Sequence, residues 1–210
     1  MAATAANGEV SVFSSATNPL SRSEMTALAT TLTRAFAEDP VSRWLLAPLR
    51  NPESARDSMF RRYVRSYHRD AVVTTAGGTQ GVALWGPPGY RMPSPRHAVL
   101  DALAMLKDLG TRGIFAARMY EAMVSHRPRS PHWYLAVIGT APEARGKGLG
   151  SALLRERLAL CDRDRVPAYL ESSNRANLPV YLRHGFEILR EFHYRDSPTL
   201  WLMQREPREA

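Results

Sequence analysis

The sequence has few of the features that indicate metal, disulfide or membrane chemistry. It contains one cysteine, Cys161, so it cannot form an intramolecular disulfide or a zinc ribbon. Its six histidines are scattered, without the close spacing that binds a metal ion on a helix or strand. No apolar run approaches the roughly 20 residues that span a bilayer, and residues 1–20 do not resemble a secretory signal. We therefore expect a cytoplasmic protein with no metal site and no membrane partner.

Lysine is also scarce, although the formal net charge is +8 at pH 7. A positive balance favours an anionic partner, such as nucleic acid, a membrane surface or a phosphate-rich cofactor. The chain has 28 lysine and arginine residues in total. Only Lys107 and Lys147 are lysines, and the rest are arginines. This bias is more typical of genome composition than of a lysine-rich tail, and it argues against a nucleic-acid partner.

The length and composition fit one globular domain. With 44% hydrophobic and 23% charged residues, the chain can bury a sizeable core. Residues 1–8 are small and polar and predict a disordered tail. Because residues 9–210 show no internal repeat and no linker, we expect them to form a single domain.

Helix and strand patterns follow one another through the first part of the chain. Ser21 or Ser23 can cap a helix, and Asp39 before Pro40 is typical of the start of a short second helix. Apolar spacing predicts further helices at 52–69, 97–109 and 112–125. In the helix at 97–109 it places Val99, Leu103 and Leu106 on the core side. Short alternating patterns predict strands at 9–15, 71–75 and 81–85.

The second part of the chain contains the clearest strand. Trp133 to Ile138 is almost continuously apolar, as expected of a strand that is buried on both faces. Helices are expected at 146–162 and 177–183, and strands at 167–171, 186–194 and 199–204. This mixture of elements predicts an α/β fold.

A glycine-rich loop joins the strand at 133–138 to the helix that follows it. The loop reads Arg145-Gly146-Lys147-Gly148-Leu149-Gly150-Ser151, and glycine lets an anion approach the backbone because it has no Cβ. The first N–H groups of a helix have no partner within the helix and point toward a bound phosphate. Arg145 and Lys147 add positive charge. We therefore expect the loop to hold a phosphate group.

The glycine spacing separates this loop from two common nucleotide-binding motifs. A P-loop ends in Gly-Lys-Ser/Thr, whereas here Gly148 is followed by Leu149, and a dinucleotide fingerprint needs Gly-x-Gly-x-x-Gly. The remaining pattern, Arg-x-x-Gly-x-Gly between a buried strand and an amphipathic helix, resembles the coenzyme-A loop of the GCN5-related N-acetyltransferases (GNATs). A glycine-rich helix start without a ligand is the alternative.

The resemblance extends to the segments that follow the loop. Asn174 and Tyr181 precede Gly185-Phe186 as in the second half of that family. Within the family the sequence most resembles the puromycin N-acetyltransferases, through residues 35–40, 126–128, 133–136, 146–151 and 200–203. The implied GNAT fold is a mostly antiparallel, twisted sheet of six to seven strands. It is splayed between the strands at 133–139 and 167–171 and has helices on both faces.

The resemblance also implies a binding site for acetyl-CoA as cosubstrate. The backbone of Val137, Ile138 and Gly139 would pair with the pantetheine arm as an added strand does. The N–H groups of residues 145–151 would hold the pyrophosphate. Asn174 would reach the arm near the thioester, and Asn177 belongs to the same expected set.

Two side chains are expected to move protons in the reaction. By resemblance Tyr181 is the general acid that protonates the leaving sulfur, while Glu171, at the end of a predicted strand, could accept the amine proton through water. A packing role for Tyr181 and a solvated carboxylate at Glu171 are the alternatives. Cys161 lies on the apolar face of its helix and is interpreted as core, and Asp39 is interpreted only as a helix cap.

The expected function is transfer of an acetyl group to a primary amine of an antibiotic or small metabolite, by a monomer or homodimer. Residues of the helix at 112–125 either line the acceptor pocket or belong to the core: Phe115, Met119, Tyr120 and Met123. One alternative is a peptide or protein N-acetyltransferase of the same fold. The other is a non-catalytic module that senses acyl-CoA or binds nucleic acid.

Overall fold

The computed structural model describes residues 9–90 and 98–209. The disordered tail expected at 1–8 lies outside the described residues. A seven-stranded sheet runs through the molecule in the order β1-β2-β3-β4-β5-β7-β6. Its strands are β1 (Val10–Phe13), β2 (Val72–Ala76), β3 (Gly81–Gly86), β4 (Trp133–Thr140), β5 (Ala168–Ser172), β6 (Glu187–Phe192) and β7 (Leu200–Arg205). Neighbouring strands are antiparallel except β4 and β5, which are parallel, so the expected fold class is confirmed.

The described residues form seven α-helices, and side chains cap the first three of them. They are α1 (Arg22–Ala35), α2 (Pro40–Leu46), α3 (Pro52–Asp70), α4 (Ala98–Leu109), α5 (Thr111–Val124), α6 (Leu149–Asp164) and α7 (Leu178–Arg183). Ser21 and Glu24 form a capping box at α1, and the Asp39 side chain accepts a hydrogen bond at the start of α2. Such caps satisfy N–H groups that the first turn leaves free.

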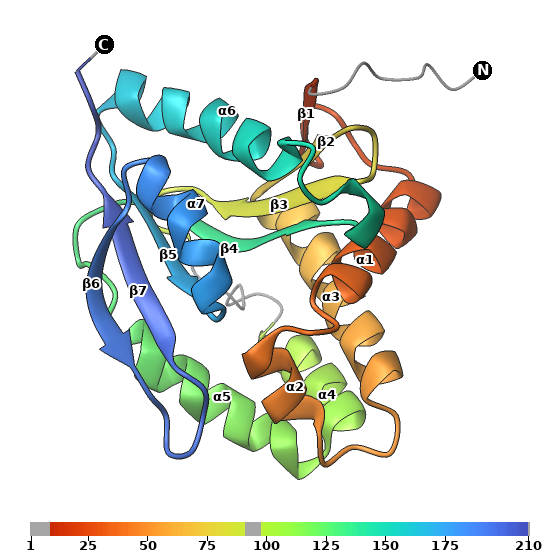
Figure 1. Cartoon of the computed structure of the whole chain (residues 1–210). Helices are drawn as coiled ribbons and strands as arrows, with labels where there is room; N and C mark the ends of the chain where they lie inside the picture. The colour runs from red at the N-terminus through yellow and green to blue at the C-terminus, as the bar shows by residue number, and fades with distance from the viewer. Residues whose placement is uncertain (1–8, 91–97, 210) are drawn as a thin grey trace.

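Helices cover both faces of the sheet, as β3 illustrates. Val82 and Leu84 belong to the core cluster that packs α1 and α3 against the sheet, whereas Ala83 and Trp85 belong to the cluster under α6. Side chains of a strand point alternately to its two faces, so α6 lies across the sheet from α1 and α3 (Figure 1). The continuously apolar pattern of β3 and β4 follows from this double burial.

The sheet opens between its two parallel strands. Pairing of β4 with β5 ends at Leu135 and Leu170, while β4 continues along β3 to Thr140. Ala136 is an extra residue in β4, because Leu84 faces Val137 and Trp85 faces Leu135. Bulges of this kind bend a strand and increase its twist. Figure 1 shows β5, β7 and β6 turning away from β3 and β4, which leaves one edge of β4 open.

Two expectations about the helices were wrong. Val99, Leu103 and Leu106 are 72%, 59% and 49% exposed, because α4 packs through its opposite side, where Asp108 accepts hydrogen bonds from Arg62 and Ser58. Apolar spacing identifies a helix face but not the side on which its neighbours lie. The helix expected from residue 146 begins at Leu149, since the glycines before it have positive φ.

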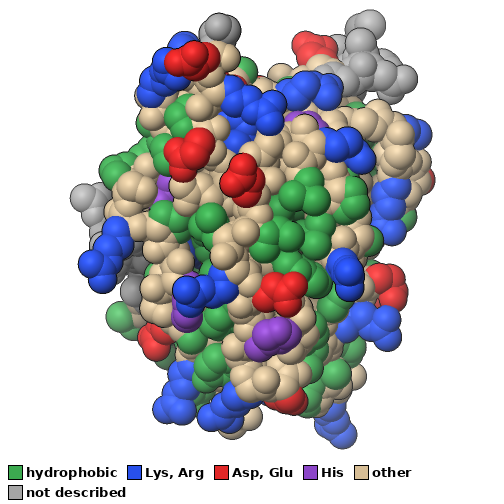
Figure 2. Space-filling view, turned by 60° about the vertical axis from the view of Figure 1, so that its left-hand side comes forward, with side chains coloured by type: hydrophobic (Ala, Val, Ile, Leu, Met, Phe, Trp, Pro, Cys, Tyr) green, Lys and Arg blue, Asp and Glu red, His purple; other side chains and the backbone are tan. Residues whose placement is uncertain are grey.

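The surface shows no concentration of positive charge on the face drawn in Figure 2. Lysine and arginine side chains are spread over it with acidic side chains among them, around hydrophobic side chains near the middle. Of the helices in the described parts of the chain, none has the length and hydrophobicity to cross a bilayer.

Candidate active site

The glycine-rich loop has the geometry of an anion cradle. Gly146 and Gly148 both have φ of 79°, in the left-handed region that glycine adopts without strain. A Cβ added at either of them, or at Gly150, would meet no described atom within 4 Å. No described side chain caps the first turn of α6. The open loop surface and the uncapped N–H groups therefore fit a pyrophosphate.

A groove of about 520 Å³ runs along this loop and the open edge of β4. Ten of the twelve residues expected to bind coenzyme line it: Ile138, Gly139, Arg145, Gly146, Gly148, Leu149, Gly150, Ser151, Asn174 and Asn177. Val137 lines the neighbouring cavity instead, and Lys147 is exposed outside both linings. The role of each residue in binding stays a prediction.

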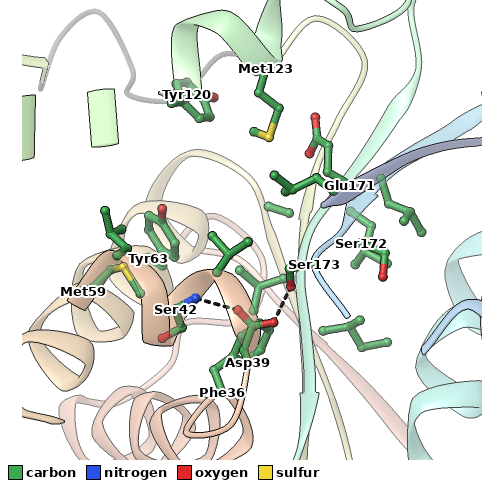
Figure 3. A pocket seen from close by; sticks show the side chains of 18 of the residues that line it. Phe36, Asp39, Ser42, Met59, Tyr63, Tyr120, Met123, Glu171, Ser172 and Ser173 are labelled. Carbon is green, nitrogen blue, oxygen red and sulfur yellow. Dashed lines mark hydrogen bonds between the residues drawn. The ribbon is translucent and has the colours of Figure 1, made fainter. Parts of the chain in front are cut away.

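A second cavity of about 240 Å³ adjoins the groove at the end of β4. Side chains of α2, α3, α5, β4 and β5 line most of it. Figure 3 shows Met59 and Tyr63 of α3 on the left, Tyr120 and Met123 of α5 at the top, and Glu171 on the right near Met123. Met119 also lines this cavity, whereas Phe115 packs against Trp44 with ring centroids 5.1 Å apart. Three of the four α5 residues named from the sequence therefore border the second cavity.

The groove and the second cavity share part of their lining. The shared residues are Phe36, Asp39, Ile138, Asn177 and Tyr181. Tyr181 is 7% exposed, and its ring packs against Phe186. Burial, and then the charge of Asp39, raise the pKa of the Tyr181 hydroxyl above its ordinary value. Tyr181 therefore keeps its proton at neutral pH where the two spaces meet.

Asp39 occupies this junction as well as capping α2. Its Oδ1 accepts a hydrogen bond from the Ser42 N–H at 2.8 Å, and its Oδ2 accepts one from the Ser173 hydroxyl (Figure 3). The side chain is buried, and burial raises the pKa of the carboxyl, while these hydrogen bonds and Arg56 act in the opposite direction. The cap could be predicted from Asp39-Pro40, but the approach of Ser173 depends on the tertiary fold.

Glu171 lies in the second cavity as one half of an ion pair. Its Oε1 accepts a hydrogen bond from Arg127 Nε at 2.8 Å, and the two side chains are only 4% and 12% exposed. The guanidinium of Arg127 lies 3.8 Å from the ring centroid of Tyr134. The carboxylate of Glu171 is therefore occupied by Arg127 inside the cavity. Arg127 was not among the residues expected at the site.

Cys161 is confirmed as a core residue. It is fully buried on α6 beside Leu154 and Leu158, and burial raises the pKa of its thiol to about 12. A thiol that stays protonated is a poor nucleophile.

Comparison with known proteins identifies the family. Residues 116–186 match the model of the acetyltransferase (GNAT) family, and this span includes the loop, most of the residues that line the groove, and Tyr181. Over this span the chain is similar to the GNAT family. It is an acetyl-CoA-dependent N-acetyltransferase, and the open cradle and the free strand edge fit acetyl-CoA as its cosubstrate.

Relatives of this GNAT protein cover most of its length. An uncharacterised N-acetyltransferase of Schizosaccharomyces pombe is 28% identical over 193 residues, which cover 85% of this chain and 78% of the relative. A Corynebacterium glutamicum structure described as histone acetyltransferase HPA2 and related acetyltransferase is 25% identical, with a TM-score of 0.70 over 96% of this chain and 98% of the other. Arylalkylamine N-acetyltransferase 2 of Aedes aegypti shares the fold at 16% identity, with a TM-score of 0.61 and coverage of 95% and 100%. The closer resemblance to puromycin N-acetyltransferases stays a prediction.

Proposed function

We propose that this acetyltransferase moves an acetyl group from acetyl-CoA to a primary amine of a small molecule. The observation that carries the proposal is the junction of the groove and the second cavity at Tyr181 and Asp39. A donor in the groove and an acceptor in the cavity would meet there and nowhere else along the two linings. We call the second cavity the acceptor cavity from here on.

The groove residues would hold the coenzyme mainly through the backbone. Among the described residues, β4 has no strand partner on its β5 side beyond Leu135, so the backbone of Val137, Ile138 and Gly139 is available to the pantetheine arm. The N–H groups at the start of α6 would bind the pyrophosphate. Acetyl-CoA, when bound, supplies the activated thioester carbonyl that the amine attacks.

Tyr181 is proposed as the general acid. Its hydroxyl is protonated at neutral pH, because burial and the nearby Asp39 charge raise its pKa. It borders both the groove and the acceptor cavity, so it can give its proton to the sulfur as the carbon–sulfur bond breaks. The amine nitrogen forms the C–N bond to the same carbonyl carbon, and coenzyme A leaves as the thiol.

Two carboxylates can accept the proton that the amine loses. Asp39 is the better placed, because it lies at the junction and burial brings its pKa nearer to neutrality. Glu171, the base expected from the sequence, is the second candidate, since it lines the acceptor cavity. Its carboxylate is already hydrogen-bonded to Arg127.

The size and walls of the acceptor cavity favour a small molecule over a peptide. A volume of about 240 Å³ is smaller than that of most ligand pockets, which hold about 300–1,000 Å³. The Aedes aegypti relative is named for small aromatic amines, whereas the Corynebacterium glutamicum protein is named for histones. Both acceptor classes therefore belong in the test.

The test is steady-state thiol release from acetyl-CoA with a panel of acceptors. The panel contains arylalkylamines, aminonucleosides, aminoglycosides, polyamines and short peptides with a free N-terminus or lysine. We expect release with at least one small amine and the acetylated amine as product. If only the peptides are turned over, the protein is instead a peptide or protein N-acetyltransferase. No turnover with any amine, together with salt-dependent retention of DNA, would favour a binding module.

A further inference from the structure

The acceptor cavity contains an unusual number of tyrosines. Tyr63 and Tyr67 come from α3, Tyr120 from α5 and Tyr134 from β4. Phe36 and Phe60 line the same cavity with ring centroids 5.1 Å apart, and the Phe60 ring lies 6.2 Å from that of Tyr63. Aromatic walls favour a ring in the ligand, through stacked and edge-to-face contacts.

Methionines complete the apolar lining of the acceptor cavity. Met59, Met119 and Met123 all border it, and Met59 and Met123 face it from two sides in Figure 3. The thioether makes favourable contacts with aromatic rings and adapts to their shape. The walls of the cavity therefore suit the body of an aromatic molecule.

One tyrosine hydroxyl in this cavity has no partner. Tyr67 is 1% exposed, and among the described residues nothing hydrogen-bonds to its hydroxyl. Its ring is held by Tyr90, with centroids 5.2 Å apart, so the hydroxyl has little freedom to reach another group. A buried polar atom that finds no partner is unfavourable unless a ligand or water satisfies it.

The charge available to a ligand lies where the acceptor cavity meets the coenzyme groove. Glu171 is neutralised by Arg127. Asp39 is hydrogen-bonded to Ser42 and Ser173, and in the described structure it forms no ion pair. An ammonium group is therefore attracted toward Asp39, next to Tyr181. A molecule held there by its ammonium group can offer a different polar group to Tyr67.

We propose that the acceptor is a small arylalkylamine whose ring carries a hydroxyl or similar polar group, and that Tyr67 selects it by a hydrogen bond to that group. The proposal rests on the proposed function and narrows its substrate class. The amine lies at Asp39, the ring lies among the tyrosines and methionines, and the ring substituent meets Tyr67. In this arrangement Tyr67 determines specificity but takes no part in the chemical step.

A pair of acceptors that differ by one hydroxyl tests the role of Tyr67. Tyramine and 2-phenylethylamine share the amine and the ring, and only tyramine can bond to Tyr67. A site that bonds a substrate hydroxyl rejects the analogue without it, because its own polar group is then left unpaired. We expect kcat/KM for tyramine to exceed that for 2-phenylethylamine by at least about tenfold. In Tyr67→Phe the ratio should fall to within about threefold, through a higher KM for tyramine.

Tyr90→Phe is the matched control. Tyr90 packs on Tyr67 but does not line the acceptor cavity, so removing its hydroxyl should leave the ratio unchanged. Equal kcat/KM for the two amines in the wild type, or an unchanged ratio in Tyr67→Phe, overturns the proposal. Turnover of other amines but of neither of these overturns it too, while the proposed function stands. If no amine is turned over, the proposed function itself fails.

Discussion

The coenzyme groove and the acceptor cavity meet at Tyr181, but they are built in different ways. The groove is lined by the end of β4, the glycine-rich loop and the start of α6, together with residues from 35–39 and 174–183. Its glycines at 146, 148 and 150 leave the backbone open. The acceptor cavity is lined mainly by side chains from α2, α3, α5, β4 and β5. An open backbone suits a ligand common to a whole family, whereas a cavity lined by side chains can change its ligand by substitution.

Gly148→Val should cause the largest loss, because it fills a groove that depends on the missing side chain. A branched side chain would occupy the open space beside Gly148 and keep the pyrophosphate from the backbone. We expect the affinity for acetyl-CoA to fall by at least about a hundredfold, corresponding to loss of several charge-assisted hydrogen bonds. Titration calorimetry on the folded variant measures it.

Gly78→Val controls for backbone strain. Gly78 also has a positive φ, of 67°, and open space around an added Cβ, but it lies in the β2–β3 turn outside the groove. Both variants should lose similar stability, and only Gly148→Val should lose coenzyme binding. Affinity of Gly148→Val within a few-fold of wild type would contradict the cradle assignment.

The difference between the two sites also explains what the sequence could predict. Gly146, Gly148 and Gly150 are neighbours along the chain, so spacing alone indicates their role. Asp39 and Ser173 are far apart in the chain, and only the tertiary fold brings them together. Local pattern predicts a helix cap at Asp39 but cannot show what the second carboxylate oxygen contacts.

The orientation of α4 also could not be predicted from the local sequence. The spacing of Val99, Leu103 and Leu106 correctly indicates a helix with an apolar side. That side is exposed because the ion pair of Arg62 with Asp108 joins α3 to the opposite side of α4. The pairing partner of a charged side chain is not visible in the local pattern, so the buried side was predicted wrongly.

On the acceptor side, Asp39→Asn should lower kcat/KM by about a hundredfold or more, as loss of a general base does. Asparagine is also a good helix cap, so the start of α2 is preserved. Because burial raises the pKa of Asp39 in the folded state, its contribution to stability is present below the unfolded pKa of about 3.9 and is lost as pH rises through the folded pKa. The variant should therefore be no less stable at pH 7, and its advantage should shrink toward pH 4.

Glu171→Gln separates the second candidate base from the first. If Glu171 accepts the proton, turnover should fall mainly at neutral pH and recover partly as pH rises, since more acceptor amine is then already deprotonated. The pH profiles of kcat/KM for both variants decide between them. Asp39 is the base if the acidic limb of the kcat/KM profile is unchanged in Glu171→Gln but lost in Asp39→Asn.

Arg127→Gln should have a smaller effect on activity, confined to the acceptor side. It leaves Glu171 buried without its partner, and breaking a buried ion pair destabilises proteins by about 3–5 kcal/mol. We expect a lower free energy of unfolding and a KM for the amine raised by roughly tenfold, as one lost contact does. The affinity for acetyl-CoA should stay within twofold. Denaturant unfolding measures the free energy of unfolding, steady-state kinetics measures the KM, and calorimetry measures the affinity for acetyl-CoA.

Arg34→Gln is the control for this variant. Arg34 pairs with Glu143 at 2.8 Å, but both side chains are about half exposed, so water and salt screen the pair. Its loss should change stability much less than loss of Arg127. Equal losses in the two variants, or weaker coenzyme binding in Arg127→Gln, would mean that the two sites are not independent.

The most direct test of the account is single-turnover kinetics of Tyr181→Phe at saturating acetyl-CoA. Phenylalanine keeps the ring that packs against Phe186 and removes only the proton proposed for the leaving sulfur. We predict that the chemical step slows by about ten- to a thousandfold while coenzyme affinity is nearly unchanged. A rate within twofold of wild type, with chemistry limiting, would show that Tyr181 only packs and that the junction lacks its proposed acid.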